Sequence, residues 1–147
     1  RTIFDADPLV EIIAIGPVPS EKYRIVYKVQ SLRLDSKGQP IRVDATVVEI
    51  ELPQGYPKLP PVARTIAGDV VFHPNFSATK ICLMDDWAPG VQLPDLIREI
   101  GEMLQWQKYN INSPLNASAA EWSQSHTHEL PLSDHPIGGA MVKIVIN

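Results

Sequence analysis

The chain reads HPNFSATKICLMDDW over residues 73–87, and this stretch carries Cys82, the one cysteine among 147 residues. A side-chain amide, Asn75, lies a short loop before the thiol, and a large aromatic ring, Trp87, follows it. A thiol beside a fixed hydrogen-bond donor suits acyl-thioester chemistry, because sulfur can carry the acyl group while the donor stabilises the oxyanion formed on attack. A lone cysteine between two aliphatic residues is otherwise typical of a small buried apolar side chain.

Upstream of this stretch, alternating apolar and polar residues predict strands. Residues 23–30 put tyrosine and aliphatic side chains on one face, with charged and polar ones on the other, as in a half-buried strand. A turn at residues 35–38 leads to a return strand over residues 44–52, and the spacing favours an antiparallel hairpin. Residues 62–66 predict a further short strand, and residues 10–15 predict an edge strand.

Downstream, the pattern changes from irregular to helical. Residues 70–89 show no helical period, so we expect an ordered irregular segment, the usual place for a site. Apolar residues at helical spacing predict a helix over residues 93–107, and Asn116 can cap a second helix over residues 117–124. Residues 140–146 are either a late strand or a tail that pairs with something else. Antiparallel strands followed by helices predict an α+β fold.

Length and composition fit one soluble globular domain over residues 1–147, with its core at about residues 23–125 and a divergent C-terminal tail at 126–147. A net charge of −4 without a Lys/Arg cluster argues against nucleic acid as a partner, because neutralising phosphates needs a basic patch. No apolar run reaches the length of a membrane span. A single cysteine fits a reducing compartment, so we expect a cytoplasmic protein.

Five motifs, in a fixed order, decide what the pattern around the cysteine means. They are Tyr56-Pro57-Lys58-Leu59-Pro60-Pro61, His73-Pro74-Asn75, Ile81-Cys82-Leu83, Trp87-Ala88-Pro89 and Ser113-Pro114-Leu115-Asn116. With them the chain resembles the ubiquitin-conjugating enzyme family over about residues 23–125. The resemblance implies a four-stranded antiparallel meander packed on helices, with reduced N- and C-terminal helices. It implies a divergent member, of the kind that bacteria encode beside their own activating enzyme and modifier.

The resemblance also implies an enzyme, an acyltransferase. Cys82 would accept the carboxyl terminus of a ubiquitin-like modifier from an activating enzyme and pass it to an amine of a target protein. The activating enzyme consumes the ATP, so no cofactor is expected here. One alternative is an inert module of the same fold that only binds ubiquitin-like proteins. Another is an unrelated thiol hydrolase, which needs a base beside the thiol, and the nearest histidine in sequence is His73.

In the family, the residues flanking the cysteine have supporting roles. The resemblance implies that His73 and Pro74 support the loop, and that Trp87 packs beside the cysteine. Asn75 either donates to the oxyanion or only holds the loop in shape. Two acidic residues, Asp85 and Asp86, follow the cysteine closely and disfavour thiolate formation.

The acceptor side departs from the family pattern. Ser113 occupies a position where many members carry an acidic residue that orients and desolvates the incoming lysine. A serine can accept a hydrogen bond but cannot attract the ammonium as a carboxylate would. Asn112 and Tyr109 are nearby candidates for part of this task.

The sequence predicts no metal site. Three histidines, His126, His128 and His135, follow the second helix. Two histidines at positions i and i+2 in a proline-rich tail are only a weak sign of metal binding.

Overall fold

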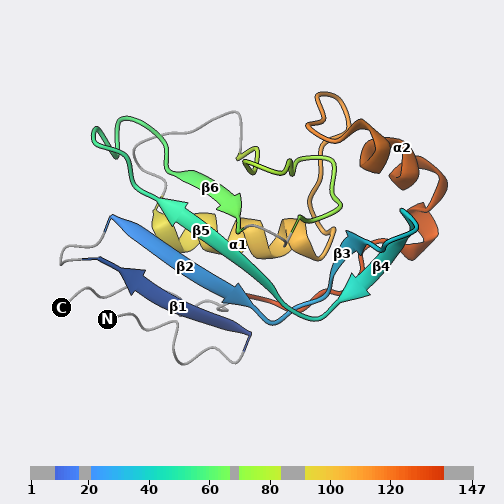
Figure 1. Ribbon diagram of the computed structural model, residues 1–147, viewed down its shortest axis with the longest axis horizontal. Helices are drawn as coiled ribbons and strands as arrows, with labels where there is room; N and C mark the ends of the chain where they lie inside the picture. The colour runs from blue at the N-terminus through green and yellow to red at the C-terminus, as the bar shows by residue number, and fades with distance from the viewer. Residues whose placement is uncertain (1–8, 17–20, 67–69, 84–91, 138–147) are drawn as a thin grey trace.

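The computed structural model describes residues 9–16, 21–66, 70–83 and 92–137. Its centre is a four-stranded antiparallel sheet in the order β1-β2-β5-β6 (Figure 1). The strands are β1 Val10–Ile15, β2 Lys22–Tyr27, β5 Thr46–Glu51 and β6 Val62–Thr65. The predicted meander is therefore confirmed, with β1 at one edge and β6 at the other.

The period of two in these strands decides which face of the sheet is buried. Tyr23, Ile25 and Tyr27 on β2 are buried, and Ile25 pairs with the buried Val48 of β5. The opposite face carries charged residues that pair across strands. There Glu49 lies 3.0 Å from the Arg64 guanidinium and 3.7 Å from that of Arg24, measured between nitrogen and oxygen.

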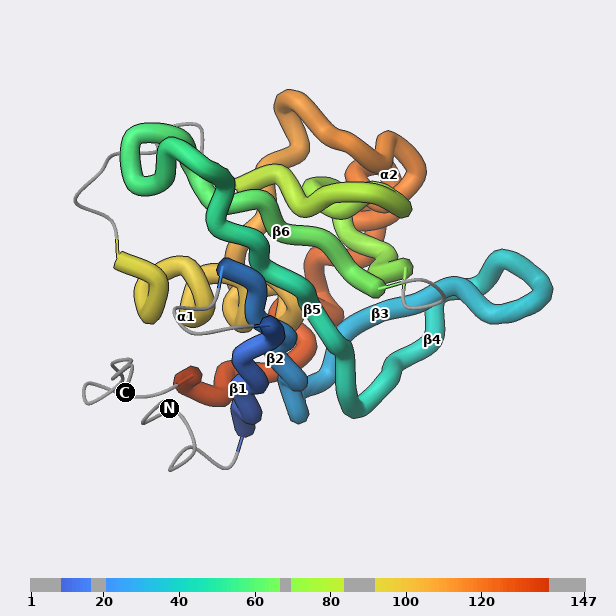
Figure 2. Tube along the Cα trace, turned by 60° about the vertical axis from the view of Figure 1, so that its left-hand side comes forward, coloured from blue at the N-terminus to red at the C-terminus, as the bar shows by residue number. Residues whose placement is uncertain are grey.

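A short ribbon, β3 Ser31–Leu34 paired with β4 Pro40–Val43, interrupts the hairpin between β2 and β5. Between the pairs Tyr27–Thr46 and Ser31–Val43, residues 28–30 face only residues 44 and 45. This extra residue bends the ladder, as a bulge does. The return strand predicted over residues 44–52 is confirmed as β5, which pairs antiparallel with β2. The ribbon before it was not predicted, because alternation alone does not reveal an inserted residue. The ribbon projects from the body of the molecule (Figure 2).

Helix α1, Leu93–Leu104, covers the buried face of the sheet (Figure 1). Its buried residues join the core of β1, β2 and β5, and the Tyr27 hydroxyl donates to the Ile97 carbonyl over 2.7 Å. The helix ends three residues before the predicted Gln107, because Trp106 adopts a left-handed φ of 59°. In the part of the chain that the structure describes, no helix is long and apolar enough to cross a bilayer.

Helix α2, Ala117–Ser125, begins as predicted, with the Asn116 side chain accepting from the Ala119 N–H over 3.0 Å. A single 3-10 turn, η2 Thr127–Glu129, follows. Residues 130–137 then run back to α1, and Ile137 enters the main core. This first part of the predicted divergent tail is attached to α1 through hydrogen bonds and Ile137, although residues 131 and 134–136 are exposed and its sequence has no regular period. The expectation for residues 140–146 lies outside the described residues.

Candidate functional site

The irregular segment predicted after β6 brings Asn75 and Cys82 together. A tight turn at residues 77–80 folds the segment back on itself, since the Ser77 Oγ accepts from the Thr79 and Lys80 N–H groups over 3.2 and 3.0 Å. The Cys82 N–H then donates to the Asn75 carbonyl over 2.8 Å. A second backbone bond, from the Ile81 N–H to the Ala63 carbonyl over 2.8 Å, attaches this segment to β6.

His73 is fully buried among aromatic rings, and both of its ring nitrogens are engaged. Nδ1 accepts from the Asn75 N–H over 3.0 Å, so the proton sits on Nε2, which donates to the Lys108 carbonyl over 3.0 Å. Burial lowers the pKa of His73 to about 4, although the bond to Lys108 opposes the shift. The ring is therefore neutral at pH 7, and it could act as a base only by giving up the Asn75 bond.

Asn75 makes a two-bond bridge to the backbone of Asn110. Its Oδ1 accepts from the Asn110 N–H over 2.8 Å, and its Nδ2 donates to the Asn110 carbonyl over 3.0 Å. Asn75 is 6% exposed while Asn110 is exposed, so both bonds are only partly buried. Nδ2 carries two hydrogens, of which Asn110 uses one. Of the two roles predicted for Asn75, this geometry favours holding the loop in shape.

Pro74 completes the attachment of this loop. Its carbonyl accepts from the N–H groups of Leu115 and Asn116 over 2.8 and 3.0 Å. Three consecutive residues, 73–75, thus bind the connection between α1 and α2 at three places. We call residues 108–116 the α1–α2 loop, and its backbone packs against residues 73–75.

Cys82 is half-buried, and its thiol makes one weak hydrogen bond, from Sγ to the Leu83 carbonyl over 3.7 Å. The side chain is therefore partly open to a reaction partner. Asp85, Asp86 and the motif Trp87-Ala88-Pro89, all named in the sequence analysis, lie outside the described residues.

On the acceptor side, the three candidate residues have different surroundings. Tyr109 is half-buried, and its ring lies 5.1 Å from that of Trp106 and 6.4 Å from that of His73, measured between centroids. Asn112 and Ser113 are exposed, and the Asn112 N–H donates to the Asn110 Oδ1 over 2.8 Å. Tyr109 thus has a packing role, while Asn112 and Ser113 present their side chains to solvent.

Sequence reasoning missed Trp106, Lys108 and Asn110, which hold His73 and Asn75. Lys108 and Asn110 act here through backbone groups, which every non-proline residue carries, so their identity gave no signal. Trp106 could have been suspected only as a large aromatic residue at the end of a helix.

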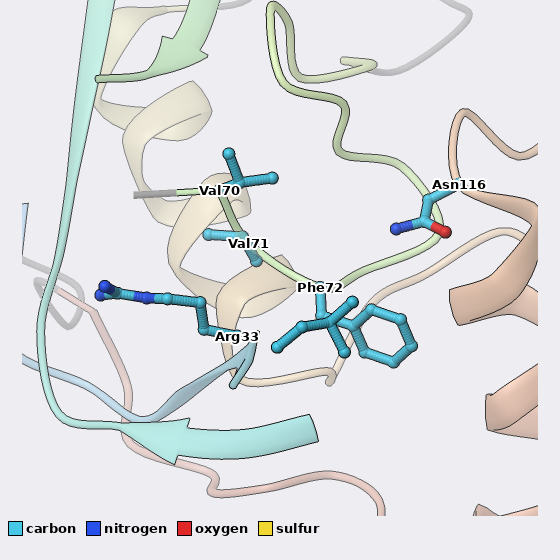
Figure 3. A pocket seen from close by; sticks show the side chains of 6 residues that line it. Arg33, Val70, Val71, Phe72 and Asn116 are labelled. Atoms are coloured by element: carbon cyan, nitrogen blue, oxygen red, sulfur yellow. The ribbon is translucent and has the colours of Figure 1, made fainter. Parts of the chain in front are cut away.

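A cavity of about 260 Å³ lies between the β3–β4 ribbon and the start of α2 (Figure 3). Its lining residues are Arg33, Leu34, Val70, Val71, Phe72 and Asn116. None of them is a predicted site residue, and the cavity is slightly smaller than a typical small-molecule site. Cys82 therefore remains the candidate reactive group.

The histidines after α2 show a packing arrangement. The His126 ring stacks on Trp122 with centroids 4.3 Å apart, and its Nδ1 lies 2.8 Å from the Trp122 carbonyl. Across the described ranges, no three His, Cys, Asp or Glu side chains are grouped so that they could hold a metal ion.

The family model described as ubiquitin-conjugating enzyme matches residues 36–130. The chain belongs to the ubiquitin-conjugating enzyme family. A solved structure described as a novel ubiquitin-conjugating enzyme is similar, with a TM-score of 0.61 and 18% identity over 84% of this chain and 78% of that one. At this identity the likeness shows a shared fold. No curated protein matches the chain. Ubiquitin-conjugating enzymes are transferases of a conjugation pathway, and members interact with ubiquitin-like modifiers, activating enzymes and targets.

Proposed function

We propose that Cys82 carries a ubiquitin-like modifier as a thioester. The Cys82 thiolate attacks the modifier's C-terminal carbonyl in its thioester with the activating enzyme, and the activating enzyme's thiol leaves. An uncharged amine of the target then attacks the new thioester, Cys82 leaves as the thiolate, and the nitrogen gives a proton to solvent as the amide bond forms. The activating enzyme would consume the ATP, so no cofactor is proposed here.

The observation that carries this proposal is the placement of Cys82. The thiol is half-buried in a loop that the Asn75 carbonyl and the α1–α2 loop hold in one shape. A carrier needs a positioned thiol and no dedicated base, because its acyl group arrives already activated. A free cysteine also suits a reducing compartment, and we propose the cytoplasm.

The state of His73 argues against an unrelated thiol hydrolase. Such an enzyme needs a base aligned with its nucleophile. His73 is buried, neutral at pH 7 and bonded through both ring nitrogens to the backbone. It supports the loop in this proposal and moves no proton.

The test is incubation with an activating enzyme, ATP and modifier, followed by a gel without reductant. We expect an adduct that reductant removes and that Cys82→Ala abolishes. An equally abundant adduct with Cys82→Ala would refute the assignment. Modifier binding without any adduct would favour the inert binding module of the same fold.

A further inference from the structure

The C-terminal segment of residues 132–137 is attached to the end of α1 mainly through the buried amide of Gln105. The Gln105 Nε2 donates to the carbonyls of Gly101 and His135 over 3.2 and 3.0 Å. Its Oε1 accepts from the Ser133 Oγ over 2.6 Å and from the His135 N–H over 2.9 Å. Both hydrogens and both lone pairs of the amide are thus used. Gln105 is fully buried, so its own amide is shielded from water, whereas its partner His135 lies at the surface.

Further contacts hold the same segment, since the Gln107 Nε2 donates to the Ser133 carbonyl over 3.0 Å and Arg42 donates to the Leu132 carbonyl over 3.3 Å. The Gln105 carbonyl accepts from the Leu132 N–H over 2.8 Å. At the far end of the segment, Ile137 packs so closely on α1 that a Cβ at position 101 would lie 2.5 Å from its Cγ1. Gly101 and Gln105 therefore hold the two ends of the segment against one face of the helix.

Directly after Gln105, the chain makes an unusual turn towards the thiol site. Trp106 has a φ of 59°, a conformation that costs free energy for a bulky residue and persists only when the surroundings enforce it. The Trp106 ring is buried, with its centroid 4.9 Å from that of His73. Two residues later, the Lys108 carbonyl accepts from His73.

We propose that Gln105 is a positioning residue for thioester discharge. It acts by fixing the segment of residues 132–137 to α1 and thereby setting where Trp106 and the α1–α2 loop meet His73 and Asn75. The chain of contacts is continuous: Gln105 precedes Trp106, Trp106 packs on His73, His73 accepts from the Asn75 N–H, and the Asn75 carbonyl accepts from Cys82. This role rests on the thioester function proposed above.

The test uses Gln105→Met, which keeps the length of the side chain and removes its hydrogen bonds. Gln124→Met makes the same change at an exposed position of α2 and is the matched control. We expect the single-turnover rate constant for discharge of purified thioester to lysine to fall about tenfold or more with Gln105→Met, since small displacements of a reacting geometry are costly. This rate constant is measured per charged molecule, so a merely lower folded fraction does not change it.

A second measurement needs no activity. The NMR titration of His73 should move from a pKa of about 4 towards the ordinary 6.5 in Gln105→Met, because a loosened Trp106 admits water to the ring. If the wild-type chain forms no thioester, the proposed function fails, and this titration still tests the positioning role.

Wild-type discharge together with wild-type His73 titration in Gln105→Met would overturn the proposal. A lower melting temperature alongside that result would make Gln105 merely structural. If Gln105→Met does not fold, Ser133→Ala removes one of the four bonds and Gly101→Ala displaces Ile137. Both variants should show slower discharge and a raised His73 pKa to a smaller degree. If both readouts stay at wild type in both variants, the proposal is refuted.

Discussion

Replacing Asn75 by alanine separates the two roles predicted for its amide. The change removes two hydrogen bonds, to the N–H and the carbonyl of Asn110. A lost bond costs ~1–3 kcal/mol when its partner stays buried and unsatisfied. Asn110 is exposed, so water can partly restore its bonds, and the lower limit of ~1 kcal/mol per bond applies. We therefore expect a loss of about 2 kcal/mol in the free energy of unfolding.

For a chain of this length, each kcal/mol lowers the melting temperature by roughly 2–4 °C, so Asn75→Ala should melt about 4–8 °C lower. Because the same bridge fixes the loop that carries Cys82, charging and discharge should slow together. The assays are thermal unfolding followed by circular dichroism and single-turnover kinetics of each half-reaction. Asn110→Ala is the matched control, since it keeps both backbone groups that bind Asn75 and should melt closer to wild type.

A different result would refute this reasoning. If Asn75→Ala melts like wild type and charges normally, but discharges about a hundredfold more slowly, the amide is an oxyanion donor and its bridge to Asn110 contributes little. Unchanged stability with unchanged kinetics would eliminate both roles.

Three further predictions address other residues. Cys82→Ser should form a slower adduct that reductant does not remove, an oxyester seen on a reducing gel, and a reductant-labile adduct would contradict it. Ser113→Asp should speed discharge to free lysine and leave charging nearly unchanged, because a carboxylate attracts the ammonium; equal or slower decay of the thioester across lysine concentrations and pH values would show that Ser113 does not face the acceptor. The pKa of His73 is near 4 in the folded state and about 6.5 in the unfolded chain, so His73 of the unfolded chain binds its proton first as the pH falls. The free energy of unfolding should therefore be highest above pH 6.5 and fall between pH 6.5 and 4. This loss is on the order of 3 kcal/mol; denaturant melts should show it in wild type and in His128→Gln but much less in His73→Gln, and equal slopes in all three would exclude His73 as the source.

The sheet and the starts of both helices could be predicted from sequence because local chemistry specifies them. Alternation along β2 marked its buried face, and Asn116 marked the cap of α2. The end of α1 could not be predicted, because Trp106 is an ordinary helix residue that tertiary packing holds in a left-handed conformation. The same limit applies to residues 132–137, whose attachment depends on the buried Gln105 amide and not on any local period.

The thiol site shows this limit in another form. Its motif residues were visible, but the groups that hold them were not, because the Lys108 carbonyl, both backbone groups of Asn110 and the Leu115 N–H are common to almost any residue. Because the α1–α2 loop binds residues 73–75 through backbone groups, these hydrogen bonds remain when its side chains change, unless a proline removes an N–H. The exposed side chains of Asn112 and Ser113 can therefore differ between related chains without disturbing the bonds that place Cys82. By this reasoning, Ser113→Asp should change the rate of discharge and leave the position of the thiol intact.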